Sequence, residues 1–178
     1  MKKFKHIALL TISFFVFLCV KQARCQEYNY KINAAYIYNF TKYIEWPAEI
    51  TKTGNFVIGI IGNSPVYDEL TSIAKQRKIG TQSIEVRQIK PEDAQFCHVV
   101  VVSNSSSNVL KQLAELTKSK PILVITEKEG CAYKNACISL FLDEDNDYKT
   151  KFQLNRAITE SHQLKISSQL TTLAVMVK

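Results

Sequence analysis

The stretch Cys97-His-Val-Val-Val-Val102 has four consecutive valines and is apolar on both faces of any strand that it forms. A strand that is apolar on both faces is typical of the centre of a parallel sheet, where helices cover both surfaces. The polar segment 103–108 follows it and leads to the helical apolar pattern of residues 110–116. The stretch therefore predicts a buried parallel strand followed by a helix.

Further strands and helices are predicted on both sides of this stretch. Further strands are predicted at residues 55–61, 84–89, 122–125, 137–142 and 151–154, and helices at 28–46, 65–78, 155–161 and 167–177. Strands that alternate with helices indicate βαβ units with right-handed crossovers. We expect an α/β fold: a single three-layer domain with a mostly parallel five- to six-stranded sheet flanked by helices.

Residues 1–25 have the pattern of a secretory signal peptide. Lys2, Lys3 and Lys5 precede an apolar run from Ile7 to Val20, which is shorter than the roughly 20 residues that a membrane span needs. Ala23 and Cys25 supply the small residues before a cut after Cys25. We predict a cleaved signal peptide over residues 1–25 and one domain over residues 26–178; a lipid anchor and an uncleaved membrane anchor are the alternatives.

The predicted signal peptide changes the charge of the remaining chain. The full chain has 23 basic and 16 acidic residues, a formal net charge of +7 and a pI near 9.1. Five of the basic residues and none of the acidic ones lie in residues 1–25, so the net charge of the rest is +2. A strongly basic protein would suggest nucleic-acid binding, but the exported domain is not expected to bind nucleic acid.

Polar residues follow two of the predicted parallel strands. Asn63 and Ser64 come after the first, and Ser103 and Asn104 come after the strand 97–102. Ligands of open parallel sheets bind at the carboxyl ends of strands, so these four residues are candidate ligand-binding residues. The simpler interpretation is a tight turn with a helix-capping residue, because no glycine-rich phosphate-binding motif is present.

The sequence contains no recognisable metal or catalytic motif. Cys97 and His98 are adjacent, so on a strand they point to opposite faces and cannot chelate one ion. His162 has no sequence neighbour that would make it a ligand, and no Gly-x-Ser-x-Gly element occurs. We expect no metal, no cofactor and no enzymatic activity; a hydrolase is the least favoured hypothesis.

Cys131 and Cys137 flank a short loop that re-enters a predicted strand. In an oxidising compartment such a pair can form a disulfide, which we predict here. The alternative is that Cys137 is a small core residue and Cys131 a free thiol. Cys97 is left over and is expected to be buried.

The first predicted helix is rich in aromatic residues. Ile32, Tyr36, Phe40 and Tyr43 form one stripe, which we expect in the core. Tyr38 and Trp46 fall outside this stripe and are candidate partner-binding residues, because amphipathic rings are enriched at interfaces.

Specific motifs stand near both ends of the predicted domain. They are Ala34-Ala-Tyr-Ile-Tyr-Asn-Phe-Thr-Lys-Tyr-Ile-Glu-Trp-Pro47 and the closing motifs Phe152-Gln-Leu-Asn-Arg156 and Leu164-Lys-Ile-Ser-Ser168. These segments resemble the YfiR-like family of periplasmic proteins. The loop Glu129-Gly130-Cys131 departs from the family pattern, since Cys131 stands where an aromatic residue is usual. Some relatives carry a bridged cysteine pair in this region, which supports the predicted disulfide.

The resemblance implies a periplasmic regulatory protein that is not an enzyme. Its implied partner is the periplasmic region of an inner-membrane signalling protein of the diguanylate cyclase type, whose synthesis of cyclic-di-GMP it would repress. An outer-membrane lipoprotein that relieves the repression and a homodimer are further implied partners. A periplasmic small-ligand-binding module that uses the strand-end loops is the alternative function.

Overall fold

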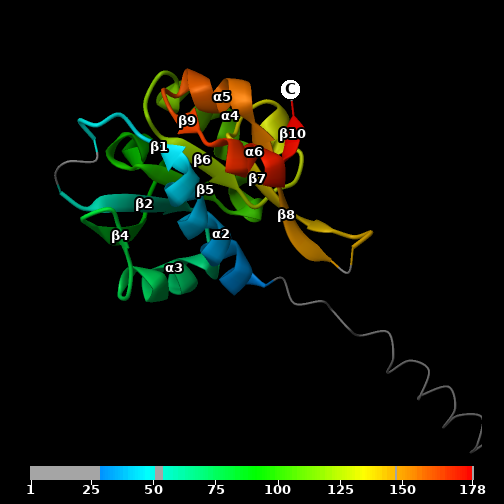
Figure 1. The fold of residues 1–178 in the computed structure, drawn as a ribbon, viewed down its shortest axis with the longest axis horizontal. Coiled ribbons are helices and arrows are strands. Elements are labelled where there is room, and N and C mark those ends of the chain that lie inside the picture. The colour runs from blue at the N-terminus through cyan, green and yellow to red at the C-terminus, as the bar shows by residue number, and fades with distance from the viewer. Residues whose placement is uncertain (1–28, 51–53, 147, 178) are drawn as a thin grey trace, which may run out of the picture.

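The computed structural model describes residues 29–50, 54–146 and 148–177 (Figure 1). The predicted signal peptide lies outside these residues. The helices are α2 (Tyr30–Tyr43), α3 (Val66–Ala74), α4 (Leu110–Thr117), α5 (Arg156–Ser161) and α6 (Ser168–Leu173), with short 3-10 helices η1 (Pro91–Phe96), η2 (Asn104–Val109) and η3 (Cys131–Tyr133).

One sheet of eight strands has the order β10-β8-β7-β6-β5-β2-β4-β3. Its strands are β2 (Phe56–Ile61), β3 (Lys78–Ile79), β4 (Gln82–Gln88), β5 (Val99–Val102), β6 (Leu123–Thr126), β7 (Ile138–Asp143), β8 (Lys149–Asn155) and β10 (Val175–Val177). A separate two-stranded antiparallel pair joins β1 (Ile44–Glu45) to β9 (Lys165–Ile166). The fold is α/β, as the sequence predicts.

The centre of the sheet is parallel. Strands β4, β2, β5, β6 and β7 run in one direction, and β5 pairs with β2 on one side and β6 on the other. All four valines of β5 are completely buried, because helices cover both faces of the strand. The prediction of a central parallel strand at this position is confirmed.

The sheet has more strands than the five or six expected, and the extra strands lie at its edges. Strand β3 has two residues, too few for a recognisable apolar run. At the other edge, the predicted helix 167–177 ends at Leu173, and Val175–Val177 pair with β8 as β10. The two valines of β10 are good strand formers, and a neighbouring strand was available to pair with this segment.

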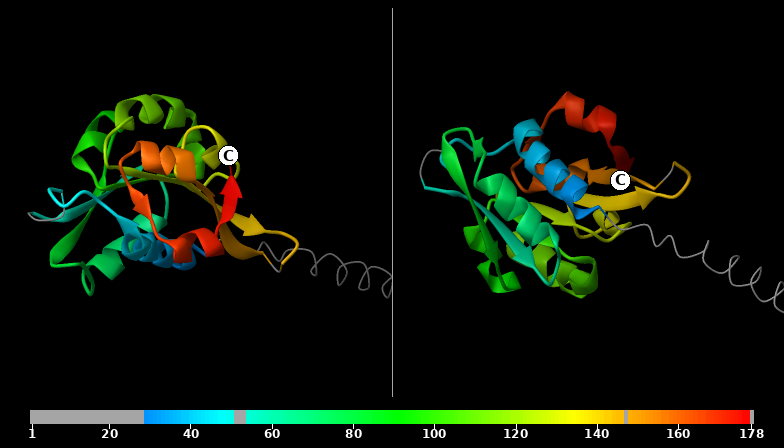
Figure 2. Two further views of the ribbon diagram at one scale, coloured as in Figure 1. Left: turned by 45° about the horizontal axis from the view of Figure 1, so that its top comes forward. Right: turned by 90° about the horizontal axis from the view of Figure 1, so that it is seen from below.

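The elements form three layers (Figure 2). In the left view, α2 and α3 lie on one side of the sheet and α4 on the other. The core between the layers is one continuous cluster that includes Phe40, Phe56 and Leu113. No helix within the described part of the chain is long and apolar enough to cross a membrane.

The face of α2 that is buried differs from the predicted stripe of Ile32, Tyr36, Phe40 and Tyr43. Phe40 is buried as expected, but Ile32 is 42% exposed, and the fully buried positions include Ala34 and Ile37. Phe40 packs edge-on against Phe152 of β8, with ring centres 4.9 Å apart. The contact with β8 thus sets which face of α2 is buried.

The structure also corrects the expectation for Trp46. This residue is only 9% exposed and belongs to the core, where its ring meets Phe56 of β2 edge-on at 5.2 Å. Trp46 directly follows β1, the short strand after α2 that pairs with β9. Trp46 therefore has little surface to offer a partner.

Candidate functional site

The sheet has a topological switch point between β2 and β5. Strand β2 pairs with β4 on one side and with β5, which comes later in the chain, on the other. The loops that follow β2 and β5 therefore leave the same edge of the sheet in different directions, which is where ligands of such folds bind. Ser64 and Ser103 lie in these loops, and both are buried.

A buried carboxylate lies at this edge. Glu127 directly follows β6 and is only 7% exposed. The Ser64 hydroxyl donates a hydrogen bond to Glu127 Oε1 at 3.0 Å and accepts one from the Val66 N–H at 3.2 Å. Ser64 thereby links Glu127 to the first turn of α3.

Helix α2 supplies the third member of the cluster. Asn33 is completely buried and faces Glu127 closely enough to lower the pKa of that carboxyl. Neither Nδ2 nor Oδ1 of Asn33 makes a hydrogen bond of good geometry. Asn33, Ser64 and Glu127 form what we call the switch-point cluster; it joins α2, α3 and β6.

Burial dominates the electrostatics of the cluster. Loss of water raises the pKa of Glu127 above its ordinary value, although the Ser64 hydroxyl, the Asn33 amide and the Asn104 backbone each lower it. The folded chain therefore binds a proton at Glu127 more tightly than the unfolded chain does.

The other strand-end residues differ in their exposure and contacts. Asn63 and Asn104 are exposed, and the Ser103 hydroxyl lies 3.1 Å from that of Ser105. Three hollows on the described part of the chain are lined by other residues. Because the Ser64 and Ser103 hydroxyls already have partners in the protein, the switch-point cluster is best explained as a polar connection between layers.

Glu127 is not among the strand-end residues that the sequence analysis names. The available signal was its position, immediately after a strand of four buried residues and therefore at the carboxyl edge of a parallel sheet.

We expect Glu127→Gln to change how stability depends on pH. Because the pKa of Glu127 is raised in the folded state, its contribution favours folding most at acidic pH and is lost as the pH rises through the folded-state pKa. The glutamine variant should therefore gain free energy of unfolding relative to the wild type as the pH rises from 4 to 7, as measured by urea denaturation.

Glu129→Gln is the control, because Glu129 is an exposed carboxylate two residues away. The variant Glu129→Gln should not gain free energy of unfolding relative to the wild type over this pH range. A gain for Glu127→Gln that is greatest at acidic pH would contradict the assignment.

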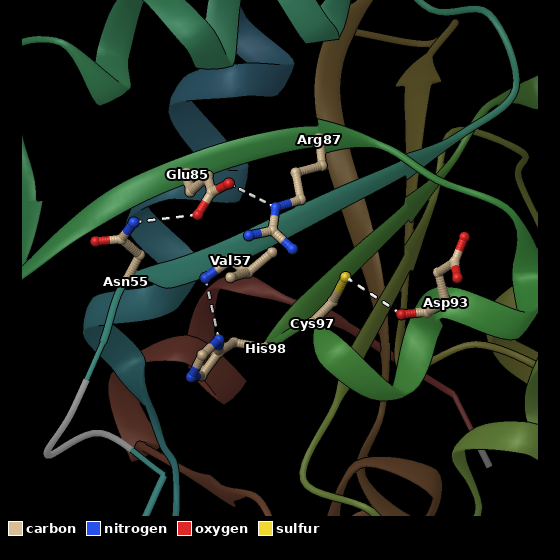
Figure 3. Close-up of polar contacts among 7 residues, drawn as sticks. All are labelled: Asn55, Val57, Glu85, Arg87, Asp93, Cys97 and His98. Atoms are coloured by element: carbon tan, nitrogen blue, oxygen red, sulfur yellow. Dashed lines mark hydrogen bonds and ion pairs between the residues drawn. The ribbon is translucent and has the colours of Figure 1, made fainter.

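Cys97 and His98 point away from each other at the opposite edge of the sheet (Figure 3). His98 Nδ1 accepts a hydrogen bond from the Val57 N–H at 3.0 Å, and Nε2 lies 3.3 Å from the carbonyl oxygen of Ile50, to which it donates. The ring stacks on Phe56 at 4.4 Å, and burial lowers the pKa of His98. These contacts hold a neutral histidine in a structural role.

Cys97 is buried as predicted, and its surroundings make it a poor nucleophile. Its sulfur lies 3.9 Å from the Asp93 carbonyl oxygen, and burial raises the pKa of the thiol to about 11. A thiol with so high a pKa stays protonated at neutral pH. Across the described residues, no group of three His, Cys, Asp or Glu side chains could hold a metal ion.

Cys131 and Cys137 are both free thiols in the structure, which therefore lacks the predicted disulfide. Cys137 is completely buried, with its sulfur 3.8 Å from His162 Nδ1, whereas Cys131 is half-buried in η3. Hydrogen bonds hold η3 in place without a disulfide: the Ala132 N–H donates to the Ser139 hydroxyl at 2.7 Å, and the Asn155 amide donates to the Ala132 carbonyl at 2.8 Å. The oxidised form stays a prediction.

Intact mass after alkylation under non-reducing conditions measures the oxidation state. If the disulfide forms in an oxidising compartment, protein purified from the periplasm should take up two fewer alkyl groups than the reduced protein, and Cys131→Ser should abolish the difference. Equal alkylation before and after reduction would refute the disulfide.

The surface offers two further hollows. One lies between α2 and α3 and includes Tyr38, the predicted partner-binding residue, in its wall. The other lies between the start of α2, the β7–β8 hairpin and α6, and contains the exposed apolar side chains Ile32, Tyr148 and Leu173.

One comparison with known proteins identifies a related family. A family model described as YfiR/HmsC-like matches residues 30–175, from the first residue of α2 to the first of β10. No curated protein matches the chain. The match spans every layer of the fold.

Proposed function

The chain belongs to the YfiR/HmsC-like family, and on this premise we propose that it is a non-enzymatic periplasmic regulator of a membrane signalling enzyme. It is exported by its signal peptide over residues 1–25, binds the periplasmic region of an inner-membrane diguanylate cyclase and lowers the synthesis of cyclic-di-GMP. The observation that carries the proposal is the family match over residues 30–175.

Repression by binding requires the regulator to prefer the inactive state of its partner. A bound protein shifts a two-state equilibrium only by its difference in affinity for the two states. The proposed protein therefore needs a contact surface and no reacting groups. The half-buried His98 and the buried Glu127 are each held by a hydrogen bond inside the protein.

An exposed apolar region supports a protein contact. Ile32 of α2, Tyr148 of the β7–β8 hairpin and Leu173 of α6 line one hollow of about 620 Å³, and each is at least 42% exposed. The adjacent residues Val175 and Met176 on the edge strand β10 are also exposed. Apolar side chains gathered on a surface mark interaction sites, and the hairpin that carries Tyr148 projects from the body (Figure 1). We call Ile32, Tyr148 and Leu173 the hairpin patch.

Deleting the gene in its native host tests the role. The cellular concentration of cyclic-di-GMP should rise, and expression of the wild-type chain should restore it. An unchanged concentration, with the cyclases shown to be expressed, would overturn the proposal.

A matched pair of variants tests the surface in the same assay. Leu173→Asp should fail to restore repression, because it places a charge in the hairpin patch. Phe96→Asp should restore it, because Phe96 is similarly exposed, 66% against 69%, but lies on η1, away from the patch. Equal repression by both variants would exclude the hairpin patch while leaving the regulatory role intact.

The implied homodimer and the outer-membrane lipoprotein remain part of the proposal. Each would bind the exposed apolar surface at this end of the sheet, either in competition with the cyclase or together with it. Pull-down with tagged wild-type and Leu173→Asp protein from membranes separates partners that need the patch from those that do not.

A further inference from the structure

A groove of about 650 Å³ lies between α2 and α3, which pack side by side (Figures 1 and 2). Lys31, Tyr38 and Lys42 of α2 face it at helical spacing, and Glu69 and Arg77 face it from α3 and the turn after it. Its volume falls in the range of about 300 to 1,000 Å³ that is usual for small-molecule sites.

The groove is cationic. Lys31, Lys42 and Arg77 contribute three positive charges, against the single carboxylate of Glu69. The ion pairs found in the described part of the chain are Arg87–Glu85, Lys151–Asp143 and Arg156–Glu160, so none of the three groove cations takes part in them. The positive charge of the groove is therefore not neutralised by ion pairs among these residues.

Two of the cations lie at the same end of the groove. The Tyr38 hydroxyl donates a hydrogen bond to the Lys78 carbonyl oxygen at 3.4 Å, which joins the second half of α2 to the end of the α3 segment. Lys42 is one helical turn beyond Tyr38, and Arg77 is next to Lys78.

Lys42 is also held in place. Its Nζ donates to Asn39 Oδ1 at 3.0 Å and lies 4.6 Å from the centre of the Tyr38 ring. A lysine that is already positioned loses less freedom when it binds an anion.

The lining favours a small ligand over a partner helix. Helices that dock in grooves need a row of apolar anchors, whereas the apolar part of this lining is limited to Ala35, Ile73 and the ring of Tyr38. Arginine and lysine, by contrast, are the side chains that bind carboxylate and phosphate groups.

We propose that the α2–α3 groove binds a small polyanion, with its carboxylate or phosphate groups on Lys42 and Arg77. The site goes beyond the proposed regulatory function and does not depend on it. Because α2 also contributes Asn33 to the switch-point cluster and Ile32 to the hairpin patch, a ligand bound here contacts the helix that connects both.

Isothermal titration calorimetry tests the site with citrate and inorganic pyrophosphate as separate probes, at constant ionic strength because salt screens exposed charges. Saturable binding of citrate alone would identify a carboxylate site, and of pyrophosphate alone a phosphate site. Binding of both would identify a site for either anion.

The variant Lys42→Glu/Arg77→Glu should weaken the binding about tenfold or more, because each charge-assisted hydrogen bond is lost and replaced by repulsion. Both side chains are exposed, so the variant should melt at nearly the wild-type temperature. Lys111→Glu on α4 is the control for charge reversal elsewhere on the surface, because α4 lies on the other side of the sheet (Figure 2), and it should bind like the wild type.

Absence of saturable binding for both probes would overturn the proposal, as would an equal loss of affinity in Lys111→Glu. Neither result bears on cyclic-di-GMP repression, which the deletion strain measures separately.

Discussion

Asn155→Ala is expected to lower the free energy of unfolding by about 2 to 4 kcal/mol. Asn155 is 3% exposed and connects three elements at the amino-terminal edge of β7. Its Oδ1 accepts a hydrogen bond from the Ile158 N–H at 2.9 Å and so caps α5, and its Nδ2 donates to the Ala132 carbonyl of η3 at 2.8 Å. Alanine removes both bonds and leaves the buried Ala132 carbonyl without its side-chain donor.

The variant Ser167→Ala is the control for Asn155→Ala, because it removes a helix cap without removing a buried hydrogen bond. Ser167 caps α6 by accepting from the Leu170 N–H at 3.2 Å, and it is only half-buried. Its loss should cost about 1 kcal/mol, as for an ordinary cap. Chemical denaturation of both variants measures the difference, and a cost for Asn155→Ala no greater than that for Ser167→Ala would show that the bond to η3 contributes nothing.

The variant Asn155→Ala also tests whether the predicted disulfide holds η3. If Cys131 and Cys137 are oxidised, the bridge holds η3 independently of Asn155. The cost of Asn155→Ala should then be smaller in oxidised than in reduced protein. The same cost in both would mean that the hydrogen bonds, and not the cysteines, position this loop.

Gly62→Ala is the second substitution with a large expected effect, about 2 to 4 kcal/mol of destabilisation. Gly62 directly follows β2 at the switch point and has a φ of +85°, a left-handed conformation that favours glycine. A Cβ at this position would also overlap with the hydroxyl groups of Ser103 and Ser106. The side chains of Ser103 and Ser106, which follow β5, lie so close to Gly62 that a Cβ there would force them to move.

Gly54→Ala is the matched control. Gly54 has a similar φ of +74°, but a Cβ there would meet nothing within 4 Å. It should show only the backbone cost, about 1 kcal/mol. Thermal and urea unfolding of Gly62→Ala and Gly54→Ala measure both losses of stability, and their difference is the steric cost at Gly62. Equal destabilisation of the two variants would contradict the close approach at the switch point.

Several features of the fold follow from local pattern. The valines of β5 predict a central strand because four apolar residues in succession can be buried only between two helical layers. The order of strands and helices then places Ser64 and Ser103 at the same edge of the sheet, because carboxyl ends of parallel strands coincide. Helix α5 spans Arg156–Ser161, within one residue of the predicted helix 155–161.

Other features depend on contacts between distant segments. The buried face of α2 is set by Phe152 of β8, and Trp46 is buried because β2 brings Phe56 to it. Strand β10 forms because the edge of β8 is free to pair, whereas the same residues in isolation fit a helical pattern. Cys137 lies against His162, a contact between segments 25 residues apart that the spacing of the cysteines does not reveal.

The sequence by itself determined the α/β class, the parallel centre of the sheet and the family, because hydrophobic periodicity and end motifs are written in consecutive residues. Only the tertiary structure decided which polar side chains meet. Ser64 and Glu127 are 63 residues apart in the chain and 3.0 Å apart at the switch point. The environment that raises the pKa of Glu127 is made by three segments together, since desolvation is a property of the packed fold and not of any one stretch of sequence.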